Sequence, residues 1–247
     1  MHIIELKDIE QVMEPIWEPF CRNKIYINEN TIYKIYEPDG RGDFNDFLKH
    51  QEKFIDYLYS IRNINGCVVP SGKIYNDDKF IGISMHYYEY YINLEYLIAN
   101  NIKIEFKLKI LADLICALRN LHSENIIHTD LHLGNVITNL TDTRIIDLDE
   151  GEFLIFRDLY QTNDIKDLLM VILSVLYNID IYKYLKENHI EDFLSIVNLP
   201  KDFKDYIRNQ YYCKLNIDGL IYPNTFLANI DYEQIEYDKK KLNKNKI

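Results

Sequence analysis

One polar segment of this sequence combines side chains that can handle a phosphate group and its metal ion. Residues 128–135 read HTDLHLGN, and residues 144–149 read RIIDLD. Asp130, Asn135 five residues later and Asp147 after a short hairpin would bring two carboxylates and one amide to a common point. Phosphoryl transfer needs such a set, because its catalysis depends on positioning and on charge neutralisation by metal ions. A single Asp is more often an N-cap or turn residue, so the prediction depends on the three together.

This spacing resembles the catalytic loop of the protein-kinase-like superfamily, which reads H-x-D with an Asn five residues after the Asp and a metal-binding Asp on the next strand. With His132 in the place of the usual Lys and D-L-D in place of D-F-G, the segment is most similar to aminoglycoside, choline and lipopolysaccharide-core kinases and to atypical protein kinases. The resemblance implies that Asp130 orients the acceptor hydroxyl and takes its proton. It also implies that Asn135 and Asp147 hold Mg²⁺, or Mn²⁺, against the phosphates of ATP.

Three neighbouring residues receive supporting roles from the same resemblance. His128 is expected to hydrogen-bond the backbone around the second Asp rather than to act in catalysis. His132 has two readings that the sequence leaves open, a contact to the γ-phosphate or packing of the loop. Asp167 resembles the Asp that opens the helix beneath the catalytic loop, where it would accept backbone N–H bonds.

The ATP-binding lysine and its partner are expected upstream. Lys34 lies within a predicted strand and Glu52 on the following helix, in the order and approximate spacing of the family's lysine and glutamate, with Asp56 as an alternative partner. A glutamate holds the ammonium in place at the phosphates. The family's G-x-G-x-x-G loop is missing, because no glycine precedes Gly40. The turn around Asn23 is similar to the T-N-x-x-Y turn of choline-kinase-like proteins, and its backbone is expected to cover the phosphates instead.

The adenine site is expected where the first part of the chain joins the second. Met85, His86, Tyr87 and Tyr88 fall where the family's hinge binds adenine through its backbone. The alternative is an aromatic stripe of the core.

The elements around these residues change character along the chain. Residues 24–27 and 31–36 predict a hairpin, the spacing from Asp43 predicts a helix, and residues 67–70, 72–75 and 79–85 predict further strands. Later segments are helical. We therefore expect an α+β, two-lobed protein-kinase-like fold, with an antiparallel sheet and one helix in residues 1–86 and a mostly helical lobe in residues 87–247. The basic run 239–247 is expected to be a frayed tail.

Composition excludes several classes of protein. The chain has 247 residues and a formal charge of −11, which argues against a nucleic-acid partner. Its first ten residues carry charges where a signal peptide needs an apolar stretch, and no apolar run is long enough to span a membrane. The four cysteines are far apart, as in reduced proteins, so a cytoplasmic location is expected. The oligomeric state stays open.

The sequence favours an ATP- and Mg²⁺-dependent kinase that phosphorylates a hydroxyl of a small molecule or sugar. Only 19 residues separate Asp147 from Asp167 and no A-P-E follows, so a platform for peptide substrates is not expected. A serine/threonine protein kinase is the alternative. The missing glycine loop keeps a non-catalytic pseudokinase or nucleotide-binding scaffold open. A zinc hydrolase using His128, Asp130 and His132 is a further reading.

Overall fold

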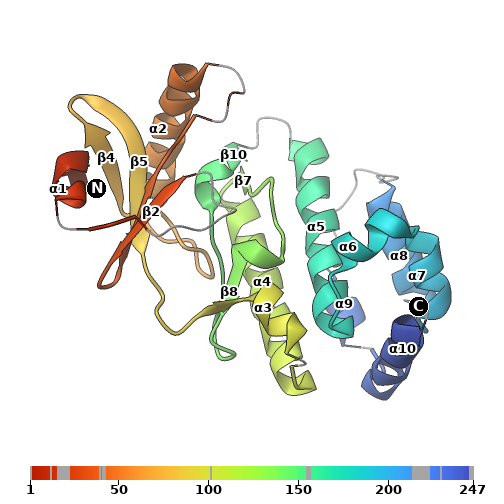
Figure 1. Cartoon of the computed structure of the whole chain (residues 1–247). Helices are drawn as coiled ribbons and strands as arrows, with labels where there is room; N and C mark the ends of the chain where they lie inside the picture. Colours follow the sequence, from red (N-terminus) through yellow and green to blue (C-terminus); the bar gives the residue numbers. More distant parts are fainter. Residues whose placement is uncertain are drawn as a thin grey trace.

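The computed structural model describes residues 2–11, 13–15, 23–38, 40, 43–100, 102–153, 157–212, 223–228 and 230–244. The chain forms two parts side by side (Figure 1). A sheet with helix α2 makes up the N-terminal part, and helices dominate the C-terminal part. This confirms the α+β, two-lobed fold expected from the sequence.

The N-terminal sheet has five strands in the order β1-β4-β5-β3-β2. The strands span His2–Glu5 (β1), Lys24–Asn28 (β2), Thr31–Ile35 (β3), Gly72–Asn76 (β4) and Lys79–His86 (β5). The expected antiparallel sheet needs one correction, because β1 pairs with β4 in parallel. Strand β1 has only four residues, too few for a pattern in the sequence to reveal it. Helix α1 (Leu6–Glu10) follows it and buries Ile9 in a small apolar cluster with Tyr26, Ile35 and Ile74.

Helix α2 (Phe44–Ile61) begins as the sequence predicts, with the side chain of Asp43 accepting a hydrogen bond from the backbone N–H of Asn45. Phe54, Ile55 and Leu58 of its apolar stripe are fully buried. Burial of such a stripe against a sheet provides most of a helix's stability in a protein.

The register of the sheet sets one row of side chains beside α2. Lys34 on β3 lies opposite Ile83 on β5, and Lys73 on β4 lies opposite the same Ile83. Side chains at paired positions point to the same face of a sheet, so the two lysines flank Ile83 on one face. Both lysines are buried, with 4% of each exposed.

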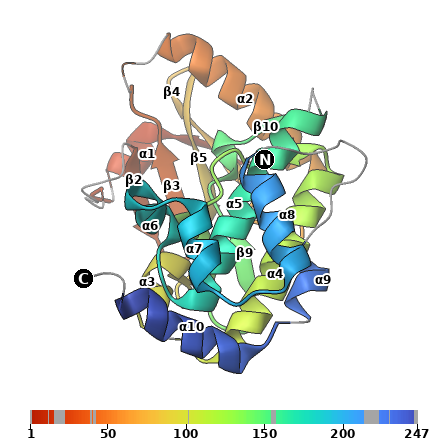
Figure 2. The ribbon, with the colours of Figure 1, turned by 90° about the vertical axis from the view of Figure 1, so that its right-hand side faces the viewer.

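The C-terminal part is built around two long helices, α4 (Ile104–Ser123) and α5 (Arg157–Tyr177). Smaller helices surround them: α3 (Leu94–Ala99), α6 (Ile181–Glu187), α7 (Ile190–Ile196), α8 (Lys201–Tyr211), α9 (Asn224–Leu227) and α10 (Tyr232–Lys244). Figures 1 and 2 show α2 and α10 at opposite ends of the molecule. The frayed tail expected from residue 239 is a correction, because α10 continues through Lys244 and Lys239 pairs with Glu236 on it.

Short strands carry the polar segment between the two long helices. Strands β7 (Ile126–Ile127) and β10 (Glu152–Phe153) pair, and β6 (Ile92–Asn93), β8 (Val136–Thr138) and β9 (Thr143–Ile145) form a second small sheet. Because β8 and β9 form a hairpin with Val136 opposite Ile145, Asn135 and Ile146 leave it side by side. The strand predicted at 67–70 is reduced to a bridge between Cys67 and Ile145.

No single helix among the described residues has both the length and the apolar character needed to cross a membrane. Residues 163–177 and α6 meet these criteria only as a pair, and the pair is bent by 100°.

Candidate active site

Asp130 and Asn135 lie together in the loop before β8. A single 3-10 turn at Leu133–Asn135 brings the amide nitrogen of Asn135 within 3.0 Å of the backbone oxygen of Asp130, to which it donates a hydrogen bond. Because this bond engages the amide nitrogen, the amide oxygen is the atom of Asn135 that could bind a ligand. The side chain of Asp130 is 59% exposed and can therefore reach a substrate.

His128 fixes the loop to the segment that carries Asp147. Its Nε2–H donates to the carbonyl oxygen of Ile146 at 2.8 Å, and its Nδ1 accepts from the backbone N–H of Asp130 at 3.3 Å. The ring is fully buried and neutral in this arrangement, since one nitrogen donates and the other accepts. His128 thus has the backbone contact expected from the sequence.

Asp164 on α5 anchors the other end of the loop. Its carboxylate accepts hydrogen bonds from the backbone N–H groups of His128, at 2.8 Å, and Thr129, at 3.0 Å, and lies 2.9 Å from Nε2 of His122. We expected Asp167 to accept these bonds, and that expectation is wrong. Asp167 lies one helical turn later and accepts a hydrogen bond from the hydroxyl of Tyr182 instead.

Two residues of the site adopt the left-handed backbone region that side chains rarely occupy. Thr129 has φ 67° and Asp147 has φ 66°. A β-branched residue such as Thr is a clear outlier there, and such backbone strain concentrates at functional sites. The backbone N–H of Thr129 donates to Asp164 and that of Asp130 donates to Nδ1 of His128, so hydrogen bonds hold the conformation of Thr129 on both of its sides.

Lys34 reaches across from the sheet to the segment after β9. Its Nζ lies 2.5 Å from Oδ1 of Asp147 and 3.0 Å from Oδ2 of Asp149. The hydroxyl of Tyr36 donates to the same oxygen of Asp149 at 2.9 Å. Burial raises the pKa of Asp149, while the charge of Lys34 opposes that rise.

Glu52 is not the partner of Lys34. Its Oε1 lies 3.3 Å from Nζ of Lys73 and accepts a hydrogen bond from the hydroxyl of Tyr75 at 2.6 Å. Asp56, the alternative partner, also pairs with Lys73, at 2.7 Å. The expected pairing of Lys34 with a carboxylate of α2 is therefore corrected: the register places Lys73, not Lys34, within reach of these carboxylates.

His132 faces the exposed carboxylate of Asp130. Nε2 of His132 lies 3.6 Å from Oδ2 of Asp130, and Nδ1 accepts from the backbone N–H of Gly134 at 3.0 Å. The interaction with His132 lowers the pKa of Asp130, and the same interaction raises the pKa of His132. A carboxylate with a lowered pKa stays ionised, as a proton acceptor must be.

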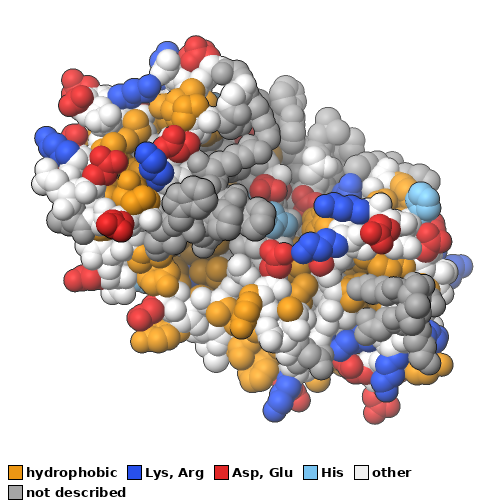
Figure 3. All heavy atoms as spheres, in the orientation of Figure 1, with side chains coloured by type: hydrophobic (Ala, Val, Ile, Leu, Met, Phe, Trp, Pro, Cys, Tyr) orange, Lys and Arg blue, Asp and Glu red, His pale blue; other side chains and the backbone are white. Residues whose placement is uncertain are grey.

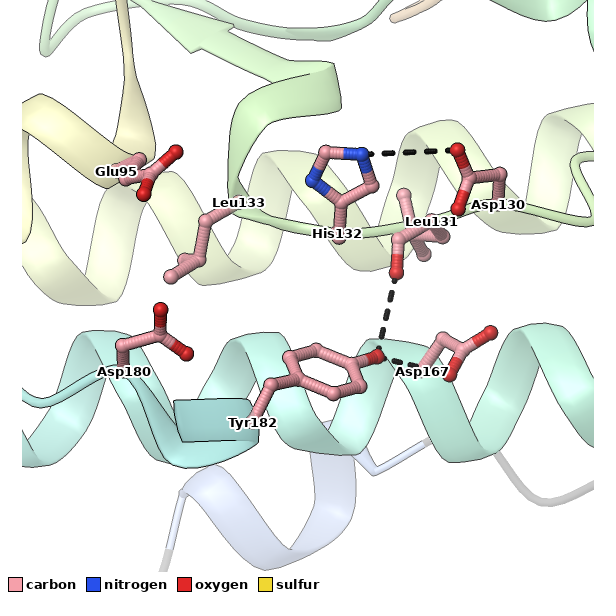
Figure 4. A pocket seen from close by; sticks show the side chains of 8 residues that line it. All are labelled: Glu95, Asp130, Leu131, His132, Leu133, Asp167, Asp180 and Tyr182. Atoms are coloured by element: carbon pink, nitrogen blue, oxygen red, sulfur yellow. Dashed lines mark hydrogen bonds and ion pairs between the residues drawn. The ribbon is translucent and has the colours of Figure 1, made fainter. Parts of the chain in front are cut away.

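A pocket of about 310 Å³ opens beside Asp130 (Figure 4). Its polar lining is acidic: Glu95 of α3, Asp130, Asp167 of α5 and Asp180, with His132 and Tyr182. Burial raises the pKa of Asp167 to about 6. Figure 3 shows acidic side chains and a histidine gathered in the hollow between the two parts of the molecule.

The nucleotide-side residues named from the sequence have mixed positions. Met85 is buried in the core and His86 stacks edge-on against Tyr88. The backbone N–H of Tyr87 donates to the carbonyl oxygen of Asn30 at 2.7 Å, so this amide is already used. Asn23 accepts from the backbone N–H of Glu37 at 3.3 Å and thereby closes the hairpin of β2 and β3. Cys21 and Arg22, the first two residues of the proposed phosphate cover, lie outside the described residues.

The donor set fits a divalent cation bound together with phosphates. Asn135 offers an amide oxygen, and Asp147 offers a carboxylate that is 31% exposed. Mg²⁺ prefers such oxygens and keeps several waters or phosphate oxygens of its own. No group of three or more His, Cys, Asp or Glu side chains in the described ranges is arranged to hold a metal ion alone.

The zinc reading loses His128 as a ligand in this geometry. Both ring nitrogens of His128 are engaged by backbone groups, and Nδ1 of His132 accepts from Gly134. A zinc ligand needs a free imidazole lone pair.

Sequence reasoning missed Asp149, Tyr36, Asp164 and Lys73. A signal existed only for Asp149, which is the second acid of D-L-D. The others depend on contacts between residues far apart in the chain.

The comparisons with known proteins are sparse. No family model matches the sequence. The chain is similar to a protein of Acanthamoeba polyphaga mimivirus named "Putative serine/threonine-protein kinase", with 26% identity over 136 residues. The match covers 50% of this chain and 24% of that protein, so the chain spans about a quarter of the relative's length. This similarity supports a relation to kinase-like proteins and leaves the acceptor undefined.

Proposed function

We propose that the protein is an ATP- and Mg²⁺-dependent kinase that transfers the γ-phosphoryl group to a hydroxyl. The observation that carries this proposal is the convergence of Lys34 from the sheet with Asp147 and, through the β8–β9 hairpin, with Asn135 and Asp130. Phosphoryl transfer requires a cation, side-chain oxygens that can bind a metal ion and a carboxylate that can accept a proton. Lys34, Asn135 with Asp147, and Asp130 could supply them.

Each residue then has a distinct task. Asn135 and Asp147 would hold the metal ion, which neutralises the charge of the phosphates when bound. Lys34 would place its ammonium against the phosphates. Asp130, kept ionised by His132, would orient the acceptor hydroxyl and accept its proton as the oxygen attacks phosphorus.

For the acceptor, we propose a small hydroxyl compound that carries positive charge. The pocket at Asp130 has the size of a small-molecule site, and four carboxylates line it. Lys183 pairs with Glu95 and Asp180 and offsets only part of this charge. Only residues 148–156 separate Asp147 from α5, which leaves little chain for a peptide-binding platform.

A serine/threonine protein kinase is the second candidate, favoured by the name of the mimivirus relative. A basic peptide would also suit an acidic pocket. The pseudokinase alternative predicts nucleotide binding with no turnover.

The test is ATP consumption with Mg²⁺ in the presence of an aminoglycoside, an amino alcohol, a neutral sugar and a basic serine peptide. We expect turnover with a cationic small molecule, and loss of metal-dependent turnover in Asp147→Ala. Asp78→Asn, an exposed turn residue, is the control. Equal background rates in the wild type and Asp147→Ala would contradict the kinase assignment, and stimulation by the peptide alone would favour the protein kinase.

A further inference from the structure

Two buried lysines each form ion pairs with two carboxylates. Lys73 pairs with Glu52 at 3.3 Å and with Asp56 at 2.7 Å. Lys34 pairs with Asp147 and Asp149. Ile83 lies between the two lysines on the sheet, so each lysine contacts the carboxylates on its own side of Ile83.

Asp149 is the more deeply buried of the two carboxylates at Lys34. Its side chain is 1% exposed, against 31% for Asp147. The 3-10 turn Leu148–Glu150 directs it back toward the sheet. There its Oδ2 receives both Nζ of Lys34, at 3.0 Å, and the hydroxyl of Tyr36, at 2.9 Å. Two donors from the same stretch of chain therefore fix one carboxylate oxygen.

Because Asp149 is buried, its contact with Lys34 should persist when a metal ion binds nearby. If Asp147 holds a metal ion, its charge would be shared with that ion and would no longer serve Lys34 alone. A buried ammonium without a counter-charge is strongly unfavourable. Asp149 can supply that charge with or without the metal ion, because its buried carboxylate is already held by Lys34 and Tyr36.

We propose that Asp149, oriented by Tyr36, is the residue that positions the ammonium of Lys34 for the phosphates of ATP, in the place expected for Glu52. The inference depends on the proposed kinase function. Asp149 acts through Lys34 and does not itself touch the nucleotide, so it is a positioning residue.

A double-mutant cycle tests this role. Asp149→Asn keeps the shape of the side chain and should lower kcat/KM for ATP at least about tenfold. In a Lys34→Met background the same change should cost less than about threefold, because the residue it positions is gone. Glu52→Gln should cause a smaller loss than Asp149→Asn. An equal loss from Asp149→Asn in both backgrounds, as a metal ligand would give, overturns the proposal, as does a larger loss from Glu52→Gln.

A second measurement does not depend on activity. The dissociation constant of ATP, measured by calorimetry with no acceptor present, should rise at least about threefold in Asp149→Asn, because the ammonium of Lys34 is no longer held in place for the phosphates. Glu52→Gln should leave this constant within about twofold of wild type. An unchanged dissociation constant in Asp149→Asn overturns the positioning role, whereas ATP binding without turnover in the wild type contradicts only the kinase function. If Asp149→Asn fails to fold, Tyr36→Phe removes one hydroxyl and should show the same pattern at smaller size.

Discussion

Nζ of Lys34 and Oδ1 of Asp147 lie 2.5 Å apart, although 113 positions separate the two residues in the chain. The contact joins the N-terminal sheet to the segment after β9, so the candidate active site forms only when both parts of the molecule are folded together. Variants at either end of this contact should affect the same reaction.

Replacing Asp130 tests the proposed proton acceptor. Asp130→Asn keeps the size of the side chain and removes its basicity. We expect kcat to fall by about 10²- to 10⁴-fold while KM for ATP changes little, because Asp130 faces the acceptor pocket. Steady-state kinetics with ATP and the best acceptor of the panel measure both constants. A variant that keeps wild-type kcat would exclude Asp130 from catalysis.

The pair of Asp130 and His132 predicts the pH dependence of the reaction. Asp130 must be ionised to accept a proton, and His132 lowers its pKa, so activity should persist as pH falls until that lowered pKa is reached. His132→Gln removes this effect, and the acid limb of the kcat profile should move to higher pH. His50→Gln, on the exposed side of α2, is the control. An acid limb that stays in place in His132→Gln would show that another group sets it.

Asp164 should contribute strongly to stability, because it anchors the loop that carries Asp130. Asp164→Asn puts an amide N–H₂ group where the carboxylate accepts from two backbone N–H groups. A buried donor without a partner, and the loss of bonds to a charged acceptor, should lower the free energy of unfolding by about 3 kcal/mol. Urea denaturation measures the change, with Asp78→Asn as the exposed control. A loss below about 0.5 kcal/mol would contradict the anchoring role.

Gly82 on β5 allows the strand that carries Lys34 to approach closely. A Cβ added at Gly82 would lie 3.1 Å from the Cα of Ile35 and would collide with the backbone oxygen of Lys34. Gly82→Ala should therefore push β3 away and destabilise the protein by about 1–3 kcal/mol. Thermal unfolding should show a Tm lowered by several degrees. An unchanged Tm would mean that the sheet adapts without cost.

Local spacing was enough to predict the polar loop. Asp130 and Asn135 are joined by one 3-10 turn and one hydrogen bond, and Asp147 follows the end of a tight hairpin, so few conformations separate sequence from geometry. The helix at α2 and the hairpin of β2 and β3 were predictable for the same reason. The catalytic roles of Asp130, Asn135 and Asp147, and the binding of ATP and Mg²⁺, stay predictions.

Choices between similar side chains were not predictable in this way. Asp164 and Asp167 lie three residues apart on α5, and residues at that spacing share one face of a helix, so the pattern could not tell which carboxylate meets the loop. The structure decided this, because Asp164 is buried against the loop and Asp167 is less deeply buried.

The sequence alone determined that Asp130 and Asn135 lie together, because one short loop carries both. Only the tertiary structure decided that Lys34 meets Asp149 while Glu52 meets Lys73. The physical reason is that these pairs depend on strand register and on the placement of α2 against the sheet, which the packing of the whole core sets.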